Sequence, residues 1–265
     1  MPNKDRKLLF FDIDGTLWNS DNRIPKSAQK AIRKLRRNGH LAFLCSGRCR
    51  SYIQDPELLS LGFDGIVSGC GTMIEYGGET VFYHRIESEL AKYTVKTVRR
   101  YGFRPILEGR EHLYMDEAEF GQDFYGRKLK AEAGERLLSI SGEWGRWEIS
   151  KLSCATENAD RETCFEALSL YYDFMIHNEA VVEIVPKGFH KGTGIEAVCR
   201  LLGMDLSDTI AVGDSANDLG MMQTAGTAVA MGNGSDAAKK AADYVTSSLE
   251  QDGIWNACSH LGLLE

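Results

Sequence analysis

Hydrophobic positions follow two different spacings in this chain, and the first recurs near both ends. Consecutive apolar runs at Leu8–Phe11, Leu41–Cys45 and Gly65–Ser68 are typical of strands buried on both faces of a parallel sheet. Between the first two runs, residues 28–35 carry Ala, Ile and Leu at i, i+3, i+4 and i+7, the spacing of one helical face. The order strand, helix, strand therefore opens the chain.

The same order returns in the C-terminal third. Short apolar strands again alternate with helices whose hydrophobic residues lie on one face. Together the two regions predict a doubly wound α/β core, a Rossmann-like parallel sheet with helices on both faces. The predicted elements are helix 193–202, strand 209–212, helix 219–224, strand 227–231 and helix 236–242.

The middle of the chain has a mixed pattern, which predicts antiparallel pairs packed with helices. We therefore expect an inserted α+β domain at 83–185, with 1–82 and 186–265 forming the core and hinges near 79–85 and 186–189. Residues 117–146 are poor in apolar side chains and predict an exposed excursion. The elements expected in the insertion are helix 87–100, a hairpin of 104–107 and 112–115, strand 147–154, helix 161–170 and a hairpin of 174–176 and 181–185.

Composition excludes several classes of protein. The chain has 265 residues, 43% of them hydrophobic, and a net charge of −7, which argues against a nucleic-acid binder. Its apolar runs are too short for a membrane span, and Leu8–Phe11 is too short for a signal-peptide core. The cysteines lack any Cys-x-x-Cys spacing and predict reduced, mostly buried thiols. We expect a cytoplasmic protein with neither a nucleic-acid nor a membrane partner.

Polar residues gather where a doubly wound sheet places its ligands, at the carboxyl ends of strands. Two like charges ~4 Å apart cost about 4 kcal/mol at an effective dielectric constant of about 20, so the acids there require a cation. Oxygen ligands without His or Cys favour Mg²⁺ over zinc. The clusters are Asp12-Ile-Asp14-Gly15-Thr16, Ser46-Gly47-Arg48, Lys191, and Gly213-Asp214 with Asn217-Asp218.

Two acids one residue apart suit a reaction at phosphorus. At a strand end the chain can curl, so the carboxylates of Asp12 and Asp14 can reach one pocket. One can then attack a phosphorus atom while the other moves protons. Gly15 would permit a sharp turn, and the Thr16 hydroxyl could cap the loop or orient Asp14.

The four clusters, in this order, resemble the four motifs of the haloacid dehalogenase superfamily. The long gap between Ser46 and Lys191 resembles members that carry a large, type II cap between the second and third motifs. The segments 228–233, 242–246 and 252–253 are similar to the Cof-type sugar-phosphatase branch. The resemblance implies a Mg²⁺-dependent phosphatase that hydrolyses the monoester of a small phosphorylated metabolite, a sugar phosphate by analogy.

The resemblance also implies roles for single residues. Asp12 would be the nucleophile that forms an aspartyl-phosphate, and Asp14 would be the general acid and base. Mg²⁺ would bind the carboxylates of Asp12 and Asp214 and the backbone carbonyl of Asp14. Asp218 and Thr16 would lie behind these ligands, and Asp218 would pair with Lys191.

Phosphate binding falls to a second group of residues in the resemblance. Ser46 and the Gly47 amide would hold phosphoryl oxygens, Asn217 would hold phosphate, and Lys191 would neutralise both the phosphoryl group and the nucleophile. The chain has Ser46 where many relatives have Thr, and either hydroxyl can donate a hydrogen bond. Lys187 competes with Lys191 for its role. Arg48 could cap the next helix or reach the substrate.

Other readings of the sequence remain open. Residues 232–237 match a Gly-x-Gly-x-x-Ala dinucleotide fingerprint, which makes a non-catalytic nucleotide-binding module one alternative, although few residues follow it. A phosphomutase or phosphotransferase could use the same motifs. A basic helix face could bind RNA or be solvated; it consists of Lys26, Lys30, Arg33, Lys34 and Arg37. Trp144 and Trp147 could pack together in the inserted domain or stack on sugar.

The sequence does not identify the substrate or the oligomeric state. Specificity should lie in the inserted domain, where His177 and Glu179 are candidates only because they fall in a predicted hairpin loop.

Overall fold

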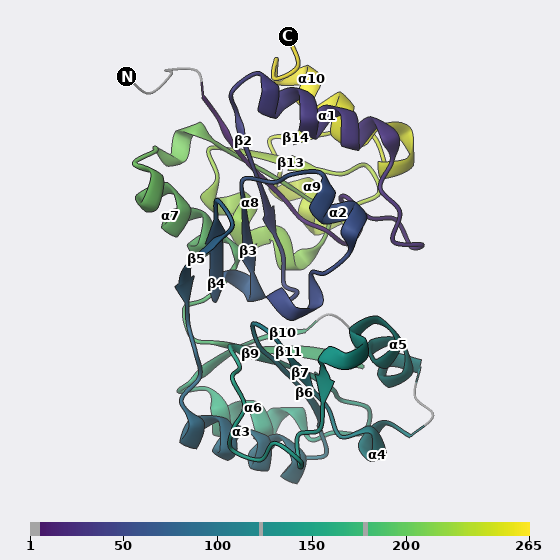
Figure 1. Ribbon diagram of the computed structural model, residues 1–265, viewed down its shortest axis with the longest axis vertical. Helices are drawn as coiled ribbons and strands as arrows, with labels where there is room; N and C mark the ends of the chain where they lie inside the picture. Colours follow the sequence, from purple (N-terminus) through teal and green to yellow (C-terminus); the bar gives the residue numbers. More distant parts are fainter. Residues whose placement is uncertain (1–5, 122–123, 177–179) are drawn as a thin grey trace. The chain divides into compact units, whose positions relative to one another are not determined.

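The computed structural model describes residues 6–121, 124–176 and 180–265, and the chain divides into two compact units. We call them the core unit and the inserted unit (Figure 1). In the described part of the chain, no helix combines the length and apolar character needed to cross a membrane. The core unit comprises the chain up to Gly47, Gln54–Phe82 and His190–Glu265; the inserted unit comprises Arg48–Ile53 and Tyr83–Phe189.

The core unit is built on a sheet with the strand order β14-β13-β12-β1-β2-β3-β4-β5. Its strands run parallel from β14 to β3, and β4 is antiparallel to β3. The predicted fold class, a doubly wound parallel sheet, is confirmed. The strands are β1 (Leu8–Phe11), β2 (Leu41–Cys45), β3 (Gly65–Ser68), β4 (Met73–Tyr76), β5 (Glu79–Tyr83), β12 (Thr209–Gly213), β13 (Thr227–Ala230) and β14 (Tyr244–Val245).

Helices cover the core sheet in the way that the apolar runs require (Figure 1). Leu8, Phe10 and Phe43 share one buried cluster with Ile195 and Met221, which lie on the helices of that face. The helices are α1 (Lys26–Arg37), α2 (Pro56–Ser60), α7 (Lys191–Leu202), α8 (Leu219–Thr224), α9 (Asp236–Ala241) and α10 (Gly253–His260), with single 3-10 turns at η2 (Gly69–Gly71), η4 (Leu206–Asp208), η5 (Ala216–Asp218) and η6 (Leu249–Gln251).

One edge of the core sheet departs from the prediction. Strands β4 and β5 were not anticipated, and β4 makes this edge antiparallel. The turn between them is Gly77-Gly78, and both residues have positive φ, 61° and 85°. Two adjacent glycines with positive φ are the signature of a tight hairpin turn, a local signal that outweighs the parallel pattern of the rest of the sheet.

The inserted unit has its own sheet, with the order β10-β11-β9-β6-β7-β8. Antiparallel pairing joins β10 through β7, as the two predicted hairpins require, and β7 pairs in parallel with β8. The strands are β6 (Arg104–Glu108), β7 (Leu113–Tyr114), β8 (Leu137–Leu138), β9 (Lys151–Ala155), β10 (Tyr172–Ile176) and β11 (Val181–Pro186).

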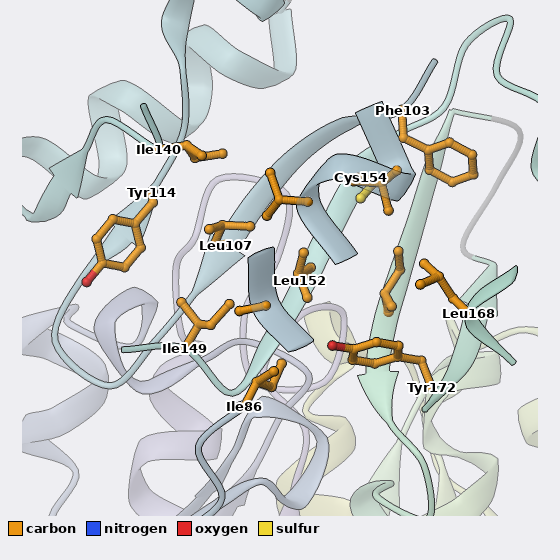
Figure 2. Packing of buried hydrophobic residues seen from close by; sticks show 14 of the residues in the cluster. Ile86, Phe103, Leu107, Tyr114, Ile140, Ile149, Leu152, Cys154, Leu168 and Tyr172 are labelled. Carbon is orange, nitrogen blue, oxygen red and sulfur yellow. The ribbon is translucent and has the colours of Figure 1, made fainter. Parts of the chain in front are cut away.

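Successive side chains along each strand point to opposite faces of this second sheet. Leu107, Leu152 and Cys154 point to the face covered by α3 (Ser88–Arg100) and α6 (Arg161–Leu168), where Leu168 and Tyr172 join them in a closed cluster (Figure 2). Tyr172 is fully enclosed and shares a hydrogen bond of 2.9 Å with the Thr94 hydroxyl on α3.

The other face corrects the expectation for residues 117–146. Instead of an exposed excursion, the described part of this segment packs against Ile106 and Leu113 of the sheet through Phe120, Leu129 and Ala133. Its few apolar residues recur at helical spacings, so a low apolar content still yields one buried side. The packed helices are α4 (Glu117–Phe120) and α5 (Phe124–Ala133), and the η3 turn (Gly134–Arg136) follows them.

A short segment that follows Gly47 belongs to the same unit. The η1 turn (Arg50–Tyr52) is fixed there by the Ser51 hydroxyl, which donates to the Gly109 carbonyl at 2.9 Å. Arg136 donates in turn to the Ser51 carbonyl at 3.1 Å. The chain therefore enters the inserted unit twice.

The predicted strand at 147–154 is shorter in the structure, whereas the predicted burial of the cysteines is confirmed. The strand predicted at 147–154 begins only at Lys151, because Trp147 is buried and donates from Nε1 to the Ile140 carbonyl at 3.0 Å rather than joining a strand ladder. The prediction of buried thiols is confirmed for the seven cysteines, which are all free and buried. The specificity candidates His177 and Glu179 lie outside the described residues.

Candidate active site

The carboxyl ends of three neighbouring strands bring the predicted motifs together. Strand β1 lies between β12 and β2, and Phe11 is in register with both Val212 and Leu44. Asp12 continues this pairing by donating its amide to the Val212 carbonyl at 3.0 Å. Asp12, Ser46 and Asp214 therefore leave the sheet along one edge, as parallel pairing requires.

Lys191 brings the acids of this edge together. It is the first residue of α7, and its side chain is 1% exposed. Its Nζ donates to the carboxylate of Asp12 at 2.7 Å and to that of Asp218 at 2.5 Å. A third contact, 3.2 Å to Oδ1 of Asn217, completes its three donors. A buried ammonium needs such partners because charge is costly to remove from water.

Asp218 also shapes the loop that carries Asp214. While Oδ1 of Asp218 faces Lys191, Oδ2 accepts the amide of Asp214 at 2.8 Å and that of Ser215 at 3.0 Å. Asp218 therefore ties the loop after β12 to the first turn of α7. A Cβ on Gly213 would come within 2.6 Å of the Asp218 carboxyl carbon, so this close approach requires glycine.

Asp214 is fixed from the other side by the loop after β1. Thr16 is fully buried and donates its hydroxyl to Oδ1 of Asp214 at 3.1 Å. Gly15 has a φ of 82°, and a Cβ there would lie 2.4 Å from Oδ2 of Asp214. Glycine at position 15 is thus required both by backbone conformation and by the approach of the second carboxylate.

The electrostatics of the site reflect an excess of negative charge. Burial, and then the neighbouring Asp218, raise the pKa of Asp12 well above its ordinary value, although Lys191 opposes this. Burial and the Asp218 charge likewise raise the pKa of Asp214 to about 6. For Lys191, burial alone would lower the pKa, but Asp12 and Asp218 outweigh it and raise the pKa above its ordinary value.

These residues fit a hard divalent cation. One carboxylate oxygen from each of Asp12, Asp214 and Asp218 lies within 4.8 Å of the others. Three carboxylates and the single ammonium of Lys191 leave a net formal charge of −2, which one Mg²⁺ would neutralise. The oxygen-only donors are those that Mg²⁺ prefers.

The remaining predicted residues lie around this cluster in different environments. The side chain of Asp14 is exposed, whereas Ser46 and Gly47 are buried. The Ser46 amide donates to the Val67 carbonyl at 2.9 Å and so continues the pairing of β2 with β3. Asn217 is half-buried, and its Oδ1 also accepts the Ser215 hydroxyl at 2.8 Å.

The structure distinguishes the two competing lysines. Lys187 belongs to the inserted unit and donates to the carbonyl of Ser169 at 2.8 Å, whereas Lys191 lies among the acids. Arg48 also belongs to the inserted unit, where its guanidinium lies 4.4 Å from the centre of the Tyr52 ring. The contact is a cation–π interaction within that unit.

Sequence reasoning missed Asn233. Its Nδ2 donates to the carbonyl of Gly15 at 2.8 Å, and its Oδ1 accepts the amide of Leu249 at 2.8 Å. It therefore ties the loop after β1 to the segment before α10. Its position in the Gly-Asn-Gly turn after β13 was a usable signal, because Asn and Gly mark specialised turns.

The same turn explains the glycines that match the dinucleotide fingerprint at residues 232–237. A Cβ on Gly234 would come 2.8 Å from the carbonyl oxygen of Asp214, so the glycine allows the turn to pack against the acidic loop. A strand, helix and strand unit does form here, but β14 is only the two residues Tyr244–Val245. Close backbone packing explains these glycines.

Two surface features were left open by the sequence. On α1, the Lys26, Lys30 and Arg33 side chains are exposed, as expected of a solvated face, while Arg36 forms an ion pair with Asp64 at 2.8 Å. Trp144 and Trp147 pack edge to face with ring centres 4.9 Å apart, and Trp147 belongs to the buried cluster of the inserted unit.

Comparison with known proteins gives consistent findings along the whole chain. A family model described as haloacid dehalogenase-like hydrolase matches residues 9–258. "Putative phosphatase YkrA" of Bacillus subtilis (strain 168) is 30% identical, with 98% of this chain and 100% of that protein covered. The 5-amino-6-(5-phospho-D-ribitylamino)uracil phosphatase YcsE of the same organism is 27% identical, with coverages of 97% and 96%.

The fold gives the same result against solved structures. A sugar phosphatase of subclass IIB of the HAD superfamily superimposes with a TM-score of 0.83 and 26% identity, covering 97% of this chain and 99% of that one. The likeness therefore extends over both units.

Proposed function

Because the chain belongs to the haloacid dehalogenase-like hydrolases, we propose that it is a Mg²⁺-dependent phosphatase that hydrolyses the phosphomonoester of a small metabolite. The observation that carries this proposal is the buried Lys191 ammonium, placed between the carboxylates of Asp12 and Asp218 with Asp214 beside them. Such a site combines a nucleophile, a fixed cation and a surplus of negative charge that a metal would balance.

In the first half of the reaction, a carboxylate oxygen of Asp12 attacks phosphorus and the bond to the leaving oxygen breaks. Asp14 gives its proton to that oxygen, so the metabolite leaves as a neutral alcohol. An aspartyl-phosphate remains on Asp12. Lys191, 2.7 Å from the Asp12 carboxylate, reduces the repulsion between this anion and the incoming phosphoryl group.

In the second half, water attacks the phosphorus atom of the aspartyl-phosphate. Asp14, now a carboxylate, takes the proton of this water, and the bond between phosphorus and Asp12 breaks. Phosphate leaves and both acids return to their initial states. The exposed position of the Asp14 side chain suits a group that exchanges protons with a substrate and with water.

The metal would be held by the carboxylates of Asp12 and Asp214 and by the backbone carbonyl of Asp14. When bound, Mg²⁺ neutralises the charge of the transferring phosphoryl group. Asp218 and Thr16 support this set, because Asp218 accepts the Asp214 amide and Thr16 donates to the Asp214 carboxylate. Ser46, the Gly47 amide, Asn217 and Lys191 would hold the phosphate oxygens.

The named relatives support a proposal for the substrate class. One is a phosphatase acting on a phosphorylated ribitylamino compound and another is a sugar phosphatase, so a sugar or sugar-alcohol phosphate is the class we favour. We assign the core unit to catalysis and the inserted unit, which adds residues 48–53 and 186–189 to the predicted insertion at 83–185, to a cap domain that selects the leaving group.

Phosphate release from a panel of sugar phosphates and phosphorylated cofactors tests the proposal. We expect release in the presence of Mg²⁺, loss of release with EDTA, and recovery when excess Mg²⁺ is added. Transfer of the phosphoryl group to an acceptor sugar without free phosphate would instead identify a phosphotransferase. Activity that is unaffected by chelation would contradict the metal assignment.

A further inference from the structure

His190 occupies an unusual position beside the candidate active site. It precedes Lys191 and caps the N-terminus of α7, with its Nδ1 accepting the amide of Gly192 at 3.1 Å. Its own amide donates to the hydroxyl of Thr193 at 3.1 Å, and that hydroxyl donates to the His190 carbonyl at 2.8 Å. Ser, Thr, Asp and Asn are the side chains that commonly fill such a position.

The imidazole is also held from outside the helix. Gly220 lies on α8, and a Cβ there would come 2.8 Å from Nδ1 of His190, so the ring packs directly on the α8 backbone. The carbonyl of His190 would similarly lie 2.8 Å from a Cβ on Gly71. Close packing on both sides fixes His190, the residue immediately before Lys191.

Only the neutral ring can make this cap. Because Nδ1 accepts a hydrogen bond, the neutral imidazole carries its proton on Nε2. A second proton would go to Nδ1, where it would face the Gly192 N–H. It would also place positive charge at the positive end of the α7 dipole and next to the Lys191 ammonium.

The surrounding elements offer little to compensate that charge. Neither α8 (Leu219–Thr224) nor η2 (Gly69–Gly71) contains an acidic or basic residue, although η2 carries the Cys70 thiol. Strand β4 contributes Glu75 and Tyr76, and α7 itself contributes Glu196, Cys199 and Arg200. The acid at the start of α8, Asp218, is engaged with Lys191 and with two backbone amides.

We propose that His190 is a positioning residue for Lys191 that works only as a neutral cap, so that protonation of its ring loosens the first turn of α7 and displaces the Lys191 ammonium from Asp12. This inference rests on the proposed function, in which Lys191 assists attack at phosphorus. It adds a proton-sensitive element that lies outside the reacting groups.

The experiment compares the wild type and two variants of His190 across pH, using phosphate release by the full chain with Mg²⁺. His190→Asn keeps a side-chain acceptor at the cap but does not titrate; His190→Ala removes the cap. Near pH 8, we expect His190→Asn to keep the wild-type kcat and His190→Ala to lower kcat about fivefold. KM should change less than kcat. As the pH is lowered, the wild type should lose about fivefold more activity than His190→Asn.

His40 provides a matched control in the same unit. Its Nδ1 accepts the amide of Lys7 at 3.1 Å, but it precedes β2 and so lies at the opposite, amino edge of the sheet. His40→Asn should keep the wild-type pH profile. An identical acid limb in the wild type and His190→Asn would overturn the inference, and so would an Asn variant as impaired as Ala at pH 8.

Failure of the proposed function would give a different result. If the wild type releases no phosphate from any substrate, the proposed function fails. The role of His190 as the N-terminal cap of α7 is then tested by hydrogen exchange of the Gly192 amide. At pH 8 this exchange should be about fivefold faster in His190→Ala than in the wild type, and near wild type in His190→Asn. Equal exchange in the three proteins would overturn the role of His190 as a cap.

Discussion

Each unit of this protein buries a lysine between two carboxylates, and the two arrangements differ in instructive ways. In the core unit, Lys191 lies 2.7 Å from Asp12 and 2.5 Å from Asp218. In the inserted unit, Lys151 lies 3.3 Å from Glu108 and 3.1 Å from Glu183. Both lysine side chains are 1% exposed, so burial alone does not distinguish them.

Their construction and charge do distinguish them. Lys151 and Glu108 are direct cross-strand partners on β9 and β6, and Glu183 is on the neighbouring β11, so one sheet supplies the whole group. Its net formal charge is −1. Lys191 draws its partners from the loops after β1 and β12, and with Asp214 the net charge is −2. The comparison separates an ion group built within one sheet from the acidic site that we propose binds a cation.

The largest effect is expected when one carboxylate is neutralised in each of the two buried ion groups. Asp12→Asn should lower phosphate release by at least about 10³-fold, because the amide cannot act as the nucleophile. Glu108→Gln should keep activity within about tenfold, since its carboxylate has no role in the proposed chemistry. The measurement is kcat/KM with Mg²⁺, with circular dichroism to check the fold. Substantial activity in Asp12→Asn would refute the assigned nucleophile.

Replacing the two lysines should separate activity from stability. Lys191→Met should lower kcat by about 10²-fold or more, because a fixed positive charge beside the nucleophile is lost. Lys151→Met should destabilise the protein by about 3 kcal/mol, because two buried carboxylates lose their partner. Urea denaturation measures the second effect, with the exposed Lys128→Met on α5 as a control. An unchanged urea midpoint in Lys151→Met would mean that its ion pairs contribute little.

The core unit carries the more negative ion group, so Mg²⁺ should stabilise it. The size of this stabilisation should depend on pH through the protonation of Asp214. Burial and Asp218 raise the pKa of Asp214 from 3.8 to about 6 in the metal-free protein. The folded state then holds a proton more tightly than the unfolded state, so this contribution to stability is present below about pH 4 and lost as pH rises through about 6.

Saturating Mg²⁺ should therefore raise Tm by about 2–4 °C near pH 8 and by much less near pH 5. Thermal unfolding with and without Mg²⁺ measures this shift, and Asp214→Asn should reduce it. A Tm increase of the same size at both pH values would contradict the coupling to carboxylate protonation.

The smallest expected effect concerns a carboxylate in the inserted unit with the opposite shift. Partial burial would raise the pKa of Asp116, but hydrogen bonds from Ser141 and Ser139 and from Arg99 outweigh it and hold the pKa at about 2. Its stabilising contribution is therefore present above about pH 4 and lost as pH falls through about 2.

Asp116→Asn should cost about 1 kcal/mol near neutral pH, with the difference from wild type disappearing towards pH 2. Urea denaturation across this range measures the change. Glu111→Gln, at a side chain that is 65% exposed, should change stability by less than about 0.5 kcal/mol. A constant difference between Asp116→Asn and wild type at all pH values would exclude the ionised carboxylate as its source.

The sequence predicted the local elements well where their patterns were strong. The run Leu8–Phe11 and the apolar face of residues 28–35 led directly to β1 and α1. Prediction failed where a pattern was weak or competed with another. The Gly77-Gly78 hairpin was overlooked, and the sparse apolar residues of 117–146 hid a packed face that contains Phe120 and Leu129.

The sequence by itself determined the parallel core, the inserted α+β region and the acids and lysine that merited attention. Only the tertiary structure showed that Lys191 rather than Lys187 meets Asp12, that Asp218 also holds the Asp214 loop, and that Asn233 ties down the loop at Gly15. The reason is physical: periodicity reports which side of an element is buried, whereas contacts between loops depend on strand register and on backbone turns formed by residues far apart in the chain.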